Sequence, residues 1–173
     1  YKRQVLPASS SSANNAVTIN AATAAVTATK TYDGNTTLTK PQISITGIGG
    51  AVIDFNLGTA AANDANVATS NKFVNFGTLA LTGGTGTTAA SNYVLPASSS
   101  SANNAVTINR ATVTLTASKT YDRSTDLTGF VTIGTGVGSQ TLTYTGAAAN
   151  DANVATANKF INAITLADGT NGG

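Results

Sequence analysis

The sequence predicts an all-β protein made of tandem antiparallel β-sandwich modules, Ig-like in type, in an elongated array. The strongest observation is a repeat: VLPASSSSANNAVTIN occurs at Val5–Asn20 and again at Val94–Asn109, and further matching strings give modules of about 88 residues. The second is composition, because Thr, Asn, Ser and Gly carry the polar fraction and Glu is absent, which favours strands and turns over helices. The third is a period-two alternation of apolar and polar residues in short segments that end at turn residues.

The first repeat copy contains short strand candidates separated by turns. They are Ala24–Thr29, Gln42–Thr46, Val52–Leu57, Lys72–Phe76, Thr78–Thr82 and the closing strand Ala105–Asn109. Within the third of these, alternation places Ile53, Phe55 and Leu57 on one face, which predicts that they point into the core. Turn residues that separate the strands lie at Asp33-Gly34-Asn35, Gly47 to Gly50 and Gly83-Gly84.

The second copy repeats this pattern. Thr112–Ala117 places Val113, Leu115 and Ala117 on one face and threonines on the other, as expected for a half-buried antiparallel strand. Further strands are expected at Phe130–Ile133 and Gln140–Thr145, on either side of the turn residues Gly134 to Gly138.

Two alanine runs, Ala60–Ala62 and Ala147–Ala149, are predicted to be loops with at most one helical turn. Each run leads into the sequence Asn-Asp-Ala-Asn, whose side chains compete with the backbone for hydrogen bonds and favour turns. The loops are then expected to enter the strands that contain Lys72 and Lys159.

The repeat copies follow one another in a permuted order. Tyr1–Asn20 carries the closing strand of a preceding module, Ala21–Asn109 is a complete β module, and Arg110–Gly173 is a second module that lacks its closing strand. Two explanations fit this order. The chain is a window of a longer polypeptide, or it is a subunit whose N-terminal strand completes the second module of another copy. The candidates for strand complementation are Val17, Ile19, Val106 and Ile108.

Composition and charge argue against several classes of function. The net charge of +2 comes from 9 bases and 7 acids spread thinly along the chain, so no basic stripe is present to bind nucleic acid. No apolar run approaches the length of a transmembrane helix, and no membrane span is expected in this segment. Because His, Cys and Glu are absent, general acid–base and nucleophilic schemes lack their usual groups. We expect neither an enzyme nor a cofactor.

The order of motifs along a module resembles a known family of repeats. Lys-Thr-Tyr-Asp-Gly at Lys30–Gly34 comes first, then Asn66-Val67 with Thr69 and Lys72, and then Ser-Asn-Tyr-Val-Leu at Ser91–Leu95 before the closing strand. This order resembles the YDG-type repeats of large bacterial surface proteins, including filamentous-haemagglutinin-like adhesins. The resemblance implies tandem modules that form a stalk on an exported protein, and therefore an extracellular location at the bacterial cell surface.

Structural roles are expected for the repeated motif residues, which are Tyr32, Asp33, Gly34, Tyr121, Asp122, Asp64, Asn66, Asp151 and Asn153. Each Tyr-Asp pair stands where a strand ends, so the carboxylate can accept backbone N–H bonds while the ring covers the end of the module. Arg123 stands where the first copy has glycine, which implies either that this position has no positive φ or that strain is tolerated there. The Asn-Asp-Ala-Asn segments are expected to be capped turns.

Other chemistries remain open for the same segments. Calcium sites recruit several carboxylates, whereas each Asn-Asp-Ala-Asn loop offers one. Lys72 or Lys159 could form a Lys–Asn isopeptide bond, with Asp64 or Asp151 as the proton shuttle. The threonine row of Thr112–Thr116 resembles the flat faces of ice-binding solenoids, although the repeat is far longer than a solenoid coil.

These observations lead to one expected function and two alternatives. We expect a structural repeat segment of an extracellular bacterial fibre or adhesin stalk that mediates cell-surface attachment or the formation of a matrix or filament. Its expected partners are neighbouring copies of the module, head to tail, and host or surface glycans or proteins. The first alternative is a self-polymerising filament subunit joined by donor-strand addition of the N-terminal strand. The second is a β protein that binds ice or glycans.

Overall fold

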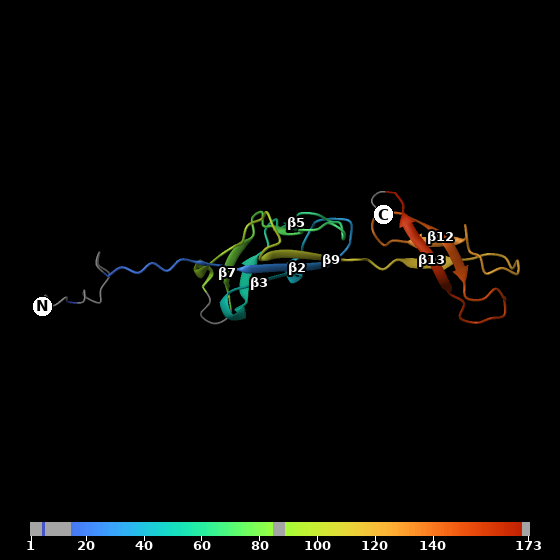
Figure 1. Cartoon of the computed structure of the whole chain (residues 1–173), viewed down its shortest axis with the longest axis horizontal. Helices are drawn as coiled ribbons and strands as arrows, with labels where there is room; N and C mark the ends of the chain where they lie inside the picture. The colour runs from blue at the N-terminus through green and yellow to red at the C-terminus, as the bar shows by residue number, and fades with distance from the viewer. Residues whose placement is uncertain (1–4, 6–14, 85–88, 171–173) are drawn as a thin grey trace.

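Two β modules stand end to end along the long axis of the molecule (Figure 1). A computed structural model describes residue 5 and the ranges 15–84 and 89–170. Short strands make up most of the regular structure in these ranges, together with the 3₁₀ turns η1 (Lys40–Gln42), η2 (Ile48–Gly50) and η3 (Ala90–Asn92). The all-β prediction is therefore confirmed. Within the same ranges, no helix has the length and apolar character needed to cross a membrane.

The first module is built from short strands in several small sheets. The strands are β1 (Ala22–Thr23), β2 (Ala25–Thr31), β3 (Ile43–Thr46), β4 (Ile53–Asn56), β5 (Ala61–Ala62), β6 (Val74–Asn75), β7 (Ala80–Gly84), β8 (Tyr93–Val94) and β9 (Asn104–Asn109). A three-stranded sheet has the order β3-β2-β9, and the two-stranded sheets are β1-β8, β4-β7 and β5-β6. The predicted strands of this copy correspond to β2, β3, β4, β6, β7 and β9.

Strand β2 is the central strand of the three-stranded sheet, and its residues alternate between buried and exposed positions along its whole length. Val26 and Ala28 face inward together with Lys30, and the threonines between them face solvent. Removing these apolar side chains from water is the main favourable term in forming the module. The buried apolar residues of this core are Ala24, Val26, Ala28, Leu38, Ile43, Ile45, Ile53, Phe55, Ala60, Ala62, Val74, Phe76, Leu79, Val106 and Ile108.

The first module is not purely antiparallel, which corrects the predicted direction of its strands. Strand β9 runs parallel to β2, from the Val26–Asn104 pair to the Thr31–Asn109 pair, and β1 runs parallel to β8. Strand β8 lies beside β1, at the end of the module where β2 begins. Because β9 follows β8 and starts from this same end, it runs in the same direction as β2. Alternation of side chains is the same in parallel and antiparallel strands, and therefore carries no information about this direction.

The second module contains β10 (Thr114–Ala117), β11 (Val131–Gly134), β12 (Leu142–Ala149) and β13 (Ile161–Asp168). Strand β10 pairs antiparallel with β11, as predicted, and β12 pairs antiparallel with β13. Strands β12 and β13 are longer than their counterparts in the first module. In the first module Gly58 and Gly77 have positive φ and interrupt the strands, whereas Thr145 and Ile164 stand at the equivalent positions in the second.

The alanine runs are strands, which corrects the prediction that they are loops. Ala61–Ala62 forms β5, and Ala147–Ala149 ends β12. The physical reason is packing: Ala60, Ala62 and Ala147 are buried, and their small side chains let the paired backbone lie close to the interior. The turn preference of Asn and Asp acts only on the residues that follow.

Candidate functional site

The first repeated motif folds as a loop around a buried lysine ammonium. Lys30 is the last inward-facing residue of β2, and its side chain is 1% exposed. Its Nζ lies 2.7 Å from Asp33 Oδ1 and donates to the backbone carbonyls of Thr37 at 2.8 Å and Asn35 at 3.0 Å. A buried charge is tolerated when it is paired and hydrogen-bonded, and these contacts use the three donors of the ammonium. Lys30 therefore holds the loop after β2 against the core.

The second copy builds the same loop around Lys119. Its Nζ lies 2.7 Å from Asp122 Oδ1 and donates to the carbonyls of Ser124 at 3.0 Å and Asp126 at 2.8 Å. The side chain is 12% exposed, which is more than in the first module. Arg123 has a φ of 67°, close to the 80° of the glycine in the first copy. The sequence left open whether position 123 has no positive φ or tolerates the strain of one. In the structure Arg123 has a positive φ, so the strain is tolerated.

The motif carboxylates are held in the ionised form. Burial raises the pKa of Asp33, but the hydrogen bonds from Lys30 and from the backbone outweigh this effect, so the pKa lies below its ordinary value. The hydrogen bond from Lys119 lowers the pKa of Asp122, and a backbone N–H adds to the effect. Each carboxylate also accepts the backbone N–H two residues further on, which closes an Asx turn.

The Tyr-Asp-Gly end of the first module contacts the second module. The Tyr32 hydroxyl bonds to the side-chain amide of Gln140, at 2.7 Å from Nε2 and 3.0 Å from Oε1. Gly34 lies against Val137, and a Cβ at Gly34 would come within 2.8 Å of Val137 Cγ1. Tyr121, the counterpart of Tyr32 in the second copy, is exposed. The motif thus lies at the junction between the two modules.

The Asn-Asp-Ala-Asn segments fold as capped turns beside a second lysine. Asp64 Oδ1 accepts the N–H of Asn66 at 2.6 Å, and this hydrogen bond lowers the pKa of Asp64. Lys72 is buried, and its Nζ donates to loop carbonyls, including that of Val67 at 2.9 Å. The ammonium and the carboxylate together fix the loop that precedes β6.

The turn of the second copy has the same hydrogen bonds. Asp151 Oδ1 accepts the N–H of Asn153 at 2.5 Å, which lowers the pKa of Asp151. Lys159 Nζ donates to the carbonyls of Asn153 at 2.9 Å and Val154 at 3.0 Å. Within the described ranges, no group of three or more His, Cys, Asp or Glu residues is placed to hold a metal ion. An isopeptide bond at either lysine stays a prediction.

Strand β9 closes the core of the first module between β2 and the segment that contains β6. Val106 and Ile108 are 6% and 4% exposed. The Val106 N–H donates to the Lys72 carbonyl at 3.0 Å, so β9 forms hydrogen bonds on both sides. Asn104 is fully buried, and its side-chain amide bonds to the N–H and the carbonyl of Val74, each at 3.0 Å.

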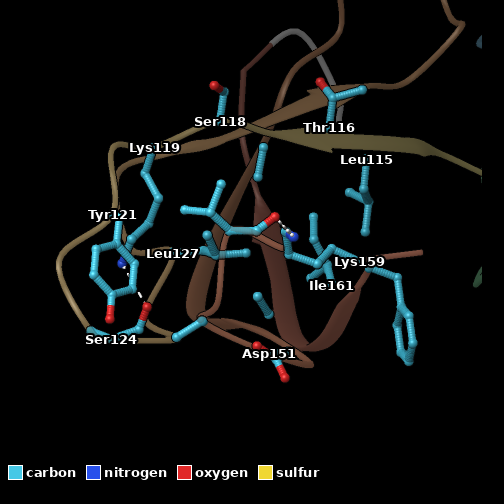
Figure 2. A pocket seen from close by; sticks show the side chains of 15 residues that line it. Leu115, Thr116, Ser118, Lys119, Tyr121, Ser124, Leu127, Asp151, Lys159 and Ile161 are labelled. Carbon is cyan, nitrogen blue, oxygen red and sulfur yellow. Dashed lines mark hydrogen bonds between the residues drawn. The ribbon is translucent and has the colours of Figure 1, made fainter. Parts of the chain in front are cut away.

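The second module has an open groove of about 730 Å³ at the place where the first module holds β9 (Figure 2). Leu115, Leu127 and Ile161 point into this β10 groove, while Thr116 and Ser118 point away from it. Further lining residues come from the two motif loops on either side and are Lys119, Tyr121, Asp151, Val154, Lys159 and Phe160. In the part of the chain that the structure describes, β10 pairs only with β11.

The structure brings the predicted motif residues into two loops per module, and it adds residues that the sequence prediction missed. Lys30, Lys119 and Asn104 were not predicted as site residues. A signal for them exists in the repeat, because each lysine precedes the motif Asp at the same spacing in both copies. The signal for Asn104 is its position directly before the closing alternation, which recurs at Asn15. No such signal exists for Gln140, which lies in a loop that differs between the copies.

The sequence model of the YDG domain matches residues 13–103, more than half of the chain. The match begins before Asn15 and ends just before β9. It therefore does not include β9, the strand that closes the first module. No curated protein matches the chain, and no solved structure matches it. On the extent of the match, the chain belongs to the YDG domain family.

Proposed function

We propose that this chain is a structural repeat segment of an extracellular bacterial fibre or adhesin stalk. The observation that carries the proposal is the contact between modules, in which the Tyr32 hydroxyl bonds to Gln140. The second module presents the same motif, with Tyr121 exposed. A chain in which each motif end contacts the next module gains length with every copy, which is the mechanical role of a tandem array.

Each complete module is proposed to be an Ig-like sandwich. Support comes from the core, to which the sheet β3-β2-β9 contributes Val26 and Ile45 and the pair β4-β7 contributes Ile53 and Phe55. A core of its own lets a module fold and resist force independently of its neighbours. The charged motif groups also favour a structural role over catalysis, because the lysine ammonium groups are engaged by loop carbonyls.

The proposed location is the bacterial cell surface, with neighbouring copies and host or surface glycans or proteins as partners. Support comes from the resemblance of the motif order to repeats of large surface proteins. It also comes from a composition in which charged residues are 9% and Thr, Asn and Ser dominate the polar face.

Antibodies against the chain test this proposal on intact cells of the source bacterium. We expect labelling without permeabilisation, loss of the label after protease treatment of intact cells, and reduced attachment when antibody fragments are added. Labelling that requires cell lysis would contradict the proposed location, and unchanged attachment would contradict the adhesive role.

A further inference from the structure

The junction between the two modules is a close contact between two loops. One is the motif loop that follows β2, and the other is the loop that connects β11 to β12. The Tyr32 N–H also donates to the Asn109 carbonyl at 2.8 Å, which ties the motif loop to the end of β9. Because the chain passes from β9 into the second module, a contact at this point can set the orientation of one module relative to the other.

The β11–β12 loop holds Val137 in a fixed position. The Thr135 hydroxyl donates to the Gln140 carbonyl at 3.0 Å and accepts the Val137 N–H at 3.3 Å. The Gln140 N–H donates to the Val137 carbonyl at 3.0 Å. Gly136 and Gly138, on either side of Val137, have positive φ and turn the backbone sharply. Since all these hydrogen bonds lie within the loop, the second module presents Val137 and Gln140 as a preformed surface.

The motif glycine leaves the space that this surface needs. A Cβ at Gly34 would lie 2.8 Å from Val137 Cγ1 and 3.4 Å from Gln140 Nε2. Carbon atoms in favourable contact are about 3.5 to 4.0 Å apart, so a side chain at position 34 would push the two loops apart. The Tyr32 hydroxyl lies 2.7 Å from Gln140 Nε2 and would lose this partner when the loops separate. Gly34 therefore controls both parts of the contact.

The second copy shows that the motif loop itself does not require glycine. Arg123 occupies the position of Gly34, and its φ of 67° forms the same turn. The Asp122 carboxylate accepts the Ser124 N–H at 3.0 Å and pairs with Lys119 at 2.7 Å, as the equivalent groups of the first copy do. Because the turn forms with a side chain in place, glycine at position 34 serves the contact with the neighbouring module.

We propose that the residue after the Tyr-Asp pair determines whether a module can clamp its neighbour. Glycine admits an aliphatic side chain from the neighbour's loop and gives a stiff joint, as Gly34 does with Val137. Arginine keeps the motif loop folded but excludes this contact, so it leaves a joint free to bend. The inference deepens the proposed function and rests on it for the role of the joint: one motif residue sets the stiffness between successive modules of the stalk.

The distance between two spin labels, one in each module, tests the proposal. The chain contains no cysteine, so Thr29→Cys and Thr165→Cys, at exposed strand positions outside the junction, can carry the labels. We expect a single narrow distance distribution in the labelled wild type and a markedly broader one after Gly34→Arg. Arg123→Gly makes the reverse exchange in the other motif loop and should leave the distribution narrow. A Gly34→Arg distribution as narrow as that of wild type would overturn the inference.

Thermal unfolding followed by circular dichroism tests the premise that the motif loop accepts a side chain. Gly34→Arg should keep the unfolding midpoint close to that of wild type, because Arg123 adopts a similar φ in the second copy. Loss of the folded first module in this variant would contradict the premise.

A pair of smaller substitutions tests the contact itself. Gly34→Ala adds only the Cβ that would meet Val137 Cγ1, so it should broaden the distance distribution. Val137→Ala removes that Cγ1 and should leave the distribution narrow, because the bond from Tyr32 to Gln140 remains. The double variant Gly34→Ala, Val137→Ala should again be narrow, since each substitution compensates for the other. A double variant as broad as Gly34→Ala alone would contradict the assigned contact.

These tests are independent of the proposed surface location. A chain that is absent from the cell surface would defeat the proposed function and leave the clamp as described. Surface labelling together with equal distance distributions in wild type and Gly34→Arg would defeat this inference alone.

Discussion

Substitution of Asn104 by alanine should strongly destabilise the first module. The Asn104 amide is fully buried and bonds to the N–H and carbonyl of Val74 at 3.0 Å and to the Ala97 carbonyl at 3.1 Å. Alanine leaves the two buried backbone groups of Val74 without partners. Each such group costs about 1 to 3 kcal/mol, so the free energy of unfolding should fall by about 2 to 6 kcal/mol. That is a large share of the stability of about 5 to 15 kcal/mol that is typical of a domain.

Urea denaturation followed by far-UV circular dichroism measures this loss. The matched control is Asn15→Ala, which changes the same residue in the exposed copy of the strand. It should alter the free energy of unfolding by less than about 0.5 kcal/mol. A loss below about 1 kcal/mol for Asn104→Ala would refute the reasoning that the buried amide satisfies the backbone of β6.

Further substitutions test the motif loops and the junction between the modules. Lys30→Met should lower the free energy of unfolding of the first module by about 2 kcal/mol, because loop carbonyls lose their donor. Lys119→Met should cost less, because its site is already more open to water, and urea denaturation compares the two. The folded pKa of Asp33 lies below the unfolded value of about 3.9. The stabilisation that the Asp33 carboxylate provides is therefore fully present above the unfolded pKa and is lost as the pH falls through the folded pKa. The thermal midpoint of Asp33→Asn should consequently fall less on acidification than that of wild type. Tyr32→Phe should leave each module stable but increase the motion of one module relative to the other in NMR relaxation. Tyr121→Phe should leave this motion unchanged.

Each of these expectations has a contrary result. Equal losses in the two lysine variants would mean that burial does not set the strength of the lysine site. If the thermal midpoint of Asp33→Asn falls on acidification as much as that of wild type, the Asp33 carboxylate does not stabilise the loop. Modules that tumble as before in Tyr32→Phe would show that the junction depends on other contacts.

Local features of the fold are predictable because they are recorded in successive residues. Strands β2 and β10 each carry an apolar face at every second residue, so their existence follows from the sequence. Strand β5 and the end of β12 escaped prediction because alanine side chains provide little contrast between faces. The parallel direction of β9 escaped it because direction depends on which end of the module the chain returns to.

Repetition likewise identified the motif residues but not their partners. Tyr32 and Asp33 stand out because they recur with their neighbours in the second copy. The bond from Tyr32 to Gln140 joins residues of different modules, and no local pattern records such a distance. In the sequence, Lys30 has no feature that distinguishes it from an exposed polar residue of a strand. Only the folded structure shows that the loop encloses its ammonium group.

The sequence by itself determined an all-β chain of repeated modules with YDG-type motifs, because strand alternation, turn residues and repeats are properties of neighbouring residues along the chain. Only the tertiary structure decided which of two identical strands is buried. Asn104–Asn109 meets β2 on one side and the Lys72–Val74 backbone on the other, and its Val106 and Ile108 are buried, whereas Val17 and Ile19 of the identical segment Asn15–Asn20 are exposed. Burial of a strand depends on what lies beside it in space, and that is set by residues far away in the sequence.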